Sequence, residues 1–238
     1  MTVPAPPHDP PQLVHARQQI VACERCFRLR AWCERVAAEK KAAHRADVYW
    51  GRPVPGFGDP LARIVVLGLA PAAHGANRTG RMFTGDGSGD FLMNAMHAVG
   101  LASLPTSRNA ADGLTLKDAY ILSAVRCAPP GNKPTVEETQ ACAPHLSAEL
   151  TALSELRVVV ALGRIAADAY WRWLASKGHR PNPKPAFGHG LTVSSPGPSL
   201  PALVQSYHPS RQNTNTRRLT PDMLRDAFRT ARRLSESG

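Results

Sequence analysis

The chain has 238 residues, of which 43% are hydrophobic and 20% charged, so it is long enough to bury the core of a globular protein. Its 29 lysines and arginines against 18 acidic residues leave a net charge of +11, which favours contact with phosphate backbones. No run approaches the roughly 20 apolar residues of a membrane span, and the proline-rich N-terminus lacks a signal-peptide pattern. A membrane protein is therefore excluded, and a cytoplasmic location is expected.

The N-terminal quarter of the chain is expected to hold a lead segment and a helical region. Residues 1–12 are rich in proline, which predicts a flexible lead. From Leu13 to His44 the sequence is rich in helix-favouring residues and carries a Cys-x-x-Cys pair near its start. Residues 51–60 hold several glycines and prolines and predict a loop.

Strand and helix signals alternate along the rest of the chain. Apolar runs predict strands over 63–67, 120–125, 157–162 and 203–207, with one short strand over 191–194. Helices are expected from a Ser88 cap to about Gly100, after a Thr135–Glu138 capping box, from Gly163 to about Lys177, and from Pro221 onward. This alternation predicts a three-layer α/β/α fold with a mainly parallel central sheet, forming one domain over residues 13–238.

Three segments with chemically useful residues directly follow predicted strands. They are the long polar loop from Gly68 to Gly87, the loop that begins at Cys127, and the segment that begins at His208. In parallel sheets the working crevice lies beyond the carboxyl ends of the strands. We therefore expect these segments to meet at one edge of the sheet and to form the functional site.

Five cysteines in a chain without an export pattern favour a metal site over disulfides. Cys23 and Cys26 form one pair, and Cys127 and Cys142 form a second, more widely spaced pair. Four thiolates suit either zinc or a 4Fe–4S cluster. Cys33 is left over, and we expect it to pack as a small apolar side chain.

Two motifs carry a resemblance to a known family. The segment GLAPAAHGANRTGRMFTGD, residues 68–86, and the segment YHPS, residues 207–210, resemble the first and last motifs of the uracil-DNA glycosylase superfamily. The long first motif is similar to that of family 5, also called type B, which is related to the iron–sulfur family 4. The resemblance implies a uracil-DNA glycosylase-like fold, a DNA substrate and a monomer. It also implies a 4Fe–4S cluster held by the four paired cysteines.

The resemblance further implies which residues perform the chemistry. Cleaving a base from deoxyribose leaves negative charge on the base and positive charge on the sugar. His208 is expected to donate a hydrogen bond to the departing base, Phe83 to stack on the flipped base, and Asp86 to position water or stabilise the sugar cation. Many relatives carry a polar residue where this chain has Ala72 and Ala73, so Asp86 is the expected substitute.

Each of these three residues also has a structural reading. His208 is compatible with a capping or core histidine, Phe83 with a core aromatic, and Asp86 with a residue that simply begins a helix. The presence of all three together favours an enzyme over a non-catalytic iron–sulfur or zinc DNA-binding relative. Neither motif contains a lysine, which favours simple hydrolysis over a Schiff-base lyase step.

Two further groups of residues are expected to contact the substrate. The resemblance implies a base pocket, broad enough for hypoxanthine or xanthine, that includes Gly68, Ala70, His74, Asn77 and Asn132. The basic segment after the last motif is expected to contact DNA through Ser210, Arg211, Gln212, Asn213, Arg217 and Arg218. Without the motifs, the polar residues would be read as ordinary loop residues and the basic segment as a solvated loop.

Overall fold

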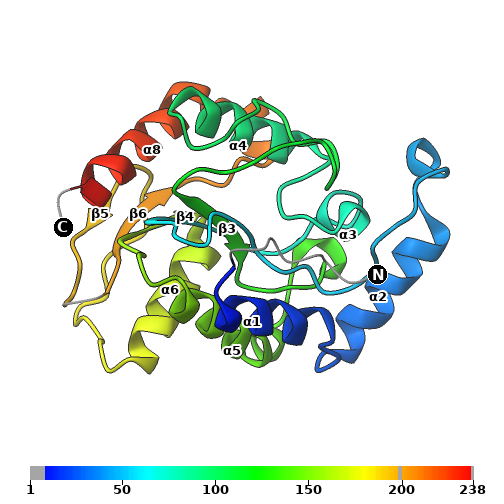
Figure 1. Ribbon diagram of the computed structural model, residues 1–238, viewed down its shortest axis with the longest axis horizontal. Coiled ribbons are helices and arrows are strands. Elements are labelled where there is room, and N and C mark those ends of the chain that lie inside the picture. The colour runs from blue at the N-terminus through cyan, green and yellow to red at the C-terminus, as the bar shows by residue number, and fades with distance from the viewer. Residues whose placement is uncertain (1–8, 198–199, 237–238) are drawn as a thin grey trace.

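A six-stranded mixed sheet forms the centre of the computed structural model, which describes residues 9–197 and 200–236 (Figure 1). The strands lie in the order β1-β3-β2-β4-β6-β5. Their bounds are Phe57–Gly58 for β1, Ile64–Gly68 for β2, Ala119–Ser123 for β3, Val158–Leu162 for β4, Thr192–Val193 for β5 and Ala202–Ser206 for β6. The four central strands are parallel and the two edge strands antiparallel, so the predicted α/β fold is confirmed.

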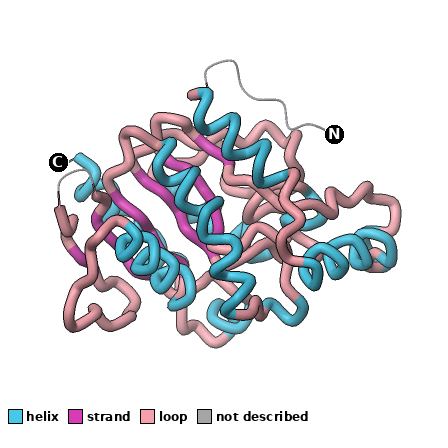
Figure 2. Tube along the Cα trace, turned by 90° about the horizontal axis from the view of Figure 1, so that it is seen from below, coloured by secondary structure: helices cyan, strands magenta, loops and turns pink. Residues whose placement is uncertain are grey.

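Helices cover both faces of the sheet (Figures 1 and 2). One face carries α4 (Gly87–Ala98) and α8 (Pro221–Glu236), and the other carries α1 (Pro11–Val21), α5 (Val136–Ala152) and α6 (Arg164–Ser176). At one end of the molecule lie α2 (Phe27–Glu39) and α3 (Ala76–Thr79), and shorter elements are η1 (Ala42–His44), η2 (Pro130–Asn132) and α7 (Arg211–Asn215). Among the residues described, none of these helices combines the length and apolar character that crossing a membrane requires.

The central strands are apolar throughout because both of their faces are covered. Alternate residues of β2 enter two different cores. Val66 packs with Met93 of α4 and Phe228 of α8, whereas Val65 packs with Tyr170 of α6 on the opposite face. Because helices cover both faces of the sheet, the functional site is formed by the loops that follow the strands.

The N-terminal region differs from the expectation of one helical stretch that follows a lead. It forms two helices, and the Cys23–Cys26 pair occupies the break between them. Helix α1 begins at Pro11, earlier than expected, because proline is well suited to the first helical position. An ion pair between Asp9 and Arg17 fixes this start. Residues 1–8 of the expected lead lie outside the described residues.

Several local predictions are confirmed and others need correction. The Thr135–Glu138 capping box is present, and α6 and α8 begin where expected. Helix α4, however, is capped by Asp86 instead of Ser88. The loop expected over 51–60 contains the edge strand β1, which is too short to show a periodic pattern.

A buried carboxylate joins β3, α5 and the loop that carries Cys127. Glu149 is fully buried, and its Oε1 accepts hydrogen bonds from the Tyr120 hydroxyl at 3.0 Å and from the Gly56 N–H at 2.9 Å. Its Oε2 lies 2.6 Å from Nη2 of Arg126, which is 1% exposed. The two groups form an ion pair, and neither of these atoms has a further hydrogen-bond partner. Glu149 thus neutralises the charge of a buried arginine next to Cys127.

Replacing Glu149 with glutamine is expected to destabilise the fold by about 3–5 kcal/mol, because Arg126 would keep a buried charge without its counter-ion. Urea unfolding followed by circular dichroism measures this loss. Glu155→Gln is the matched control: Glu155 is exposed, and its substitution should change the free energy of unfolding by less than about 0.5 kcal/mol. Equal stability of the two variants would show that the buried pair is dispensable.

Candidate active site and cysteine cavity

The loop after β2 folds tightly against its own beginning, and two glycines make this approach feasible. A Cβ on Gly68 would lie 2.8 Å from Cε2 of Phe83, and a Cβ on Gly75 would overlap Oδ2 of Asp86. Any side chain at either position would therefore displace the aromatic ring or the carboxylate. These two glycines place Phe83 and Asp86 close to the carboxyl end of β2.

Phe83 and His208 meet across the edge of the sheet. Their ring centroids are 5.8 Å apart and their planes are inclined by 32°. Phe83 adopts a left-handed backbone conformation with φ of 48°, which costs energy for a bulky residue and is typical of functional sites. The aromatic and the imidazole expected from the first and last motifs are thus brought together.

Asp86 has two roles in the structure. Its Oδ1 accepts a hydrogen bond of 2.9 Å from the Gly89 N–H and caps α4, so the helix-leading reading is correct for this oxygen. Its Oδ2 faces Gly75. Burial raises the pKa of Asp86 above its ordinary value, while the Gly89 and Ser88 N–H groups and the positive charge of Arg211 act in the opposite direction.

His208 is held as a neutral imidazole. Burial lowers its pKa to about 4. Its backbone carbonyl accepts a hydrogen bond of 2.8 Å from Nδ2 of Asn213. A Cβ on Gly163, which follows β4, would lie 3.4 Å from Cβ of His208, so the end of β4 borders the histidine. At neutral pH the ring therefore has one N–H donor to offer.

Of the other residues expected in the base pocket, Gly68 adjoins Phe83, whereas the side chains of His74 and Asn77 have partners elsewhere. Gly68 and the half-buried Ala70 lie at the end of β2. His74 contacts the Tyr49 hydroxyl through Nδ1 at 3.0 Å. The buried Asn77 donates from Nδ2 to the carbonyl oxygens of Cys33 and Ala73, each at 3.4 Å. These contacts give Asn77 a structural role in joining the loop to α2.

Asn132 lies in the loop after β3, in the short helix η2. It is exposed in η2 and has a left-handed φ of 58°. No contact with Phe83, Asp86 or His208 is recorded for it within the described residues. Its expected role in the base pocket stays a prediction.

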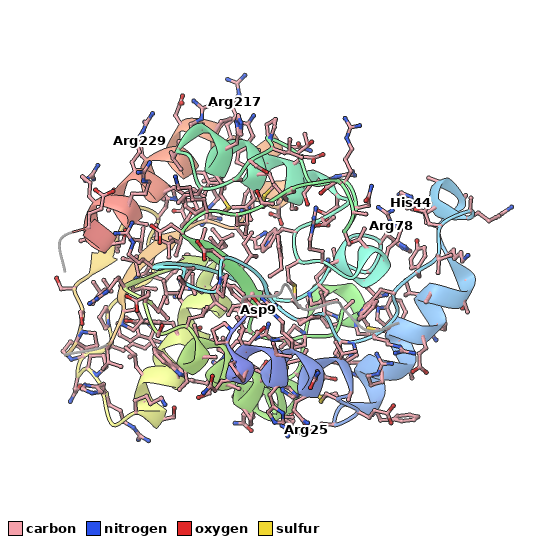
Figure 3. All side chains as sticks on the ribbon, in the orientation of Figure 1. Asp9, Arg25, His44, Arg78, Arg217 and Arg229 are labelled. Atoms are coloured by element: carbon pink, nitrogen blue, oxygen red, sulfur yellow. The ribbon has the colours of Figure 1, made fainter. Side chains whose placement is uncertain are left out.

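The basic segment after His208 forms the short helix α7, which the sequence did not predict. Ser210 caps it by accepting a hydrogen bond of 3.3 Å from the Asn213 N–H. Arg211 reaches towards the start of α4, since a Cβ on Gly87 would lie 3.9 Å from its Nε. Gln212 and Arg217 are exposed, and Arg217 projects from the edge of the molecule (Figure 3). The segment thus presents polar and cationic side chains beside the candidate site.

A cleft next to His208 contains residues that sequence reasoning missed. It has a volume of about 270 Å³ and is lined by Gly163, Arg164, Phe187, Tyr207, His208, Asn213 and Arg218. Arg218 stacks on the Tyr207 ring at 4.6 Å, and Arg164 on the Phe187 ring at 5.3 Å. The only signal for Arg164 was its position directly after a strand. Phe187 had none, because it lies in an irregular segment.

The four paired cysteines line one small cavity. Arg25, Arg30, Arg126 and His145 line the same cavity. Cys127 and Cys142 are buried, Cys23 and Cys26 are half-buried, and all are free thiols. The Arg126 N–H donates to Sγ of Cys142 at 3.3 Å. Within residues 9–197 and 200–236, no three donors are arranged to hold a single metal ion. Ligands of a four-iron cluster bind different irons, however, and stand farther apart than those of one ion.

Two thiols of this cavity, those of Cys127 and Cys142, are held in the protonated form when no cation is bound. Burial raises the pKa of Cys142 to about 12, and a hydrogen bond with Cys33, together with burial, raises the pKa of Cys127. Cys33 is fully buried, as expected, and it packs with Leu29 and Cys127. Thiolate ligation would therefore have to release protons, driven by the charge of a metal.

Comparison with known proteins agrees with this geometry. The sequence profile of the uracil DNA glycosylase superfamily matches residues 55–232, and the chain belongs to this superfamily, within the family of the type-5 enzymes. The type-5 uracil-DNA glycosylase of Thermus thermophilus is 52% identical over 218 residues, which cover 92% of this chain and 96% of that one. The type-5 enzyme of Mycobacterium tuberculosis is 51% identical over 217 residues, or 91% of this chain and 79% of that one.

The type-4 enzymes are more distant relatives. The type-4 uracil-DNA glycosylase of Archaeoglobus fulgidus is 36% identical over 116 residues, which cover 48% of this chain and 50% of that one. The two motifs therefore predicted correctly both the superfamily and the type-5 family, with the type-4 enzymes as relatives.

Replacing Asp86 with asparagine is expected to raise the melting temperature at neutral pH. Because burial raises the pKa of Asp86 in the folded state, ionisation of this carboxyl destabilises the fold at pH values above the raised pKa. Asparagine is neutral and caps a helix equally well. The advantage should vanish as the pH falls below the unfolded-state pKa, where the aspartate is protonated in both states. Calorimetry across this pH range measures the difference.

The matched control for this experiment is Asp226→Asn on the exposed face of α8. This substitution should change the melting temperature little at any pH, because an exposed ion pair contributes little. A lower melting temperature for the Asp86 variant at neutral pH would show that the carboxylate stabilises the fold.

Proposed function

We propose that the protein is a DNA glycosylase that hydrolyses the N-glycosidic bond of uracil in DNA during base excision repair. The observation that carries this proposal is the contact between Phe83 and His208, in a site whose first loop also holds the half-buried Asp86. The loops at one edge of the sheet thus offer an aromatic face for the base, a neutral hydrogen-bond donor for the leaving group and a carboxylate for the water. These are the groups that base excision needs. The names of the type-5 relatives support uracil as the substrate.

Each of the three side chains has a distinct task in the proposed reaction. The flipped base stacks on Phe83, an interaction worth about 1–3 kcal/mol. The neutral His208 donates a hydrogen bond to a base carbonyl oxygen as the bond from C1′ to the base nitrogen breaks and its electron pair moves to the base. Asp86, in its ionised form, orients the water whose oxygen bonds to C1′, and the proton of that water passes to the carboxylate.

The basic segment and the cleft beside His208 supply the proposed DNA-binding surface. Arg211, Arg217 and Arg218 extend the positive surface away from the candidate site, and phosphate contacts from such residues position DNA without reading its sequence. The arginine–aromatic pairs of the cleft offer both charge and stacking surface to the strand. Removal of these contacts should weaken binding to all DNA sequences equally.

Excision of hypoxanthine and xanthine is the finer part of the proposal. It is supported by the resemblance of the first motif, which holds Ala72 and Ala73, to that of the type-5 family.

The enzyme is expected to release uracil from a labelled oligonucleotide, detected as strand cleavage after alkali. His208→Ala and Asp86→Ala should each lower the single-turnover rate by about 10²–10³-fold, because each removes a group that acts on the charge of the transition state. The rate should also fall as the pH is lowered through the raised pKa of Asp86, since the carboxylate form is required.

His97→Ala and Asp226→Asn, both exposed on helices, serve as controls and should retain the wild-type rate. Unchanged rates in the Asp86 and His208 variants would refute the assigned roles. DNA binding without cleavage of uracil, hypoxanthine or xanthine would favour the alternative of a non-catalytic DNA-binding relative.

We also propose that Cys23, Cys26, Cys127 and Cys142 hold a 4Fe–4S cluster. The charge of the surrounding residues fits this group, because four thiolates make the cluster anionic and three arginines line the cavity. Arg126 is 1% exposed; its Nη2 is paired with Glu149, whereas its Nε and Nη1 have no hydrogen-bond partner. When bound, the cluster would supply a cross-link between the α1–α2 break and the rest of the domain.

Protein purified without oxygen is expected to be brown and to contain iron and acid-labile sulfide in equal amounts. Cys142→Ser should lose most of this iron, because one of the four ligands is replaced. Cys33→Ser is the control, since Cys33 is the cysteine that the proposed ligand set leaves out. A colourless protein that contains zinc, or a Cys33 variant that alone loses iron, would overturn the proposed ligand set.

A further inference from the structure

His145 is a buried histidine with an unused nitrogen. It lies on α5, one helical turn after Cys142, and its side chain is 6% exposed. Its Nε2 is fully buried and has no hydrogen-bond partner. Buried polar atoms nearly always have a partner, so an unpartnered one calls for an explanation, such as a group that binds beside it.

The position of His145 indicates which group binds beside its Nε2. His145 lines the cavity that the four paired cysteines surround. It also lines a wide groove on the outside of α5, together with Pro11, His15, Gln19 and Ala148. A side chain that lines both spaces stands between them. Together with Arg25, which also lines both, His145 separates the cysteine cavity from the open groove.

The protonation state of His145 suits a sulfur partner. Burial and the nearby positive charges of Arg126 and Arg25 lower its pKa to about 4, so the ring is neutral at neutral pH. A neutral imidazole has one N–H donor and one acceptor nitrogen. Thiolate and sulfide sulfurs only accept hydrogen bonds, so Nε2 must carry the proton when it faces them.

We propose that His145 is a positioning residue for the cluster: its Nε2–H donates a hydrogen bond to a cluster sulfur, and its ring shields the cluster from the groove. The inference rests on the proposed 4Fe–4S site. Hydrogen bonds to the sulfurs and exclusion of solvent are two of the factors that set the potential and the stability of such clusters. A donor at this position stabilises the more negative, reduced cluster.

The first test compares His145→Leu, which keeps the bulk and removes the donor, with His145→Gln, which keeps an N–H donor. Both are purified as full-length, cluster-containing protein, and the reduction potential is measured by voltammetry. The leucine variant should shift the one-electron equilibrium towards the oxidised cluster by about tenfold, or about 59 mV. The glutamine variant should recover at least part of this shift. His15→Leu, on the groove wall alone, should keep the wild-type potential.

A second measurement detects the contact between His145 and the cluster directly. The wild-type protein is labelled with ¹⁵N-histidine, its cluster is reduced, and pulsed electron paramagnetic resonance is recorded. A hyperfine coupling to a histidine nitrogen is expected, and it should be absent from labelled His145→Gln. No coupling in the wild-type protein, or a coupling that persists in the variant, would overturn the proposal.

The two proposals fail in different ways. If the wild-type protein contains no iron and sulfide, the proposed cofactor is wrong and the role of His145 falls with it. If the cluster is present and His145→Leu and His145→Gln both keep the wild-type potential and bleach with ferricyanide at the wild-type rate, the cofactor stands and the role of His145 is refuted.

Discussion

The candidate site depends on a steric constraint: two loops must reach across a strand that separates them. Strands β2 and β6 carry the first and last motifs, but β4 lies between them, which puts their axes roughly 10 Å apart. The two loops nevertheless bring the Phe83 and His208 ring centroids to 5.8 Å from each other. Gly68 and Gly75 allow the close approach within the first loop. Gly163, which follows β4, has a φ of 97°, a backbone conformation that favours glycine.

Burial shifts the pKa values of His208 and Asp86, but only at His208 does the shift favour the form that the proposed reaction needs. It favours the neutral form of both, so it lowers the pKa of His208 and raises that of Asp86. For His208 the neutral form is the one that the proposed reaction needs. For Asp86 the needed form is the charged one, which the Gly89 N–H and the charge of Arg211 support. The proposed reaction therefore requires Asp86 in the form that is less favourable for stability.

The sequence predicted the elements well where the signal was periodic or carried by a motif. The four central strands and the helix starts at Gly163 and Pro221 have strong local signals. The break between α1 and α2 does not, because the residues around Cys23 are not helix breakers. The order of the strands could not be predicted either, so the position of β4 between the two motif strands appears only in the structure.

The candidate site was predicted best where a motif fixed the residue and least where tertiary contacts decide. Asn77 belongs to the first motif, yet its side chain turns towards α2. Arg164 and Phe187 belong to neither motif, yet they border the cleft beside His208. A sequence pattern identifies residues that share a loop, but the direction of each side chain depends on neighbours far along the chain.

Hydrogen bonds link the cysteine cavity to the candidate active site through α2. A structural role for the proposed cluster follows, although the proposed reaction has no redox step. Asn77, in the first motif loop, donates to the carbonyl of Cys33 on α2. The segment after α2 continues this contact, since the Gly51 N–H donates to the Asn77 carbonyl at 3.0 Å. Helix α2 and the segment after it thus hold the loop that carries Phe83 and Asp86. Because α2 begins directly after Cys26, a cross-link through the cysteines would hold this loop in the conformation that brings Phe83 to His208.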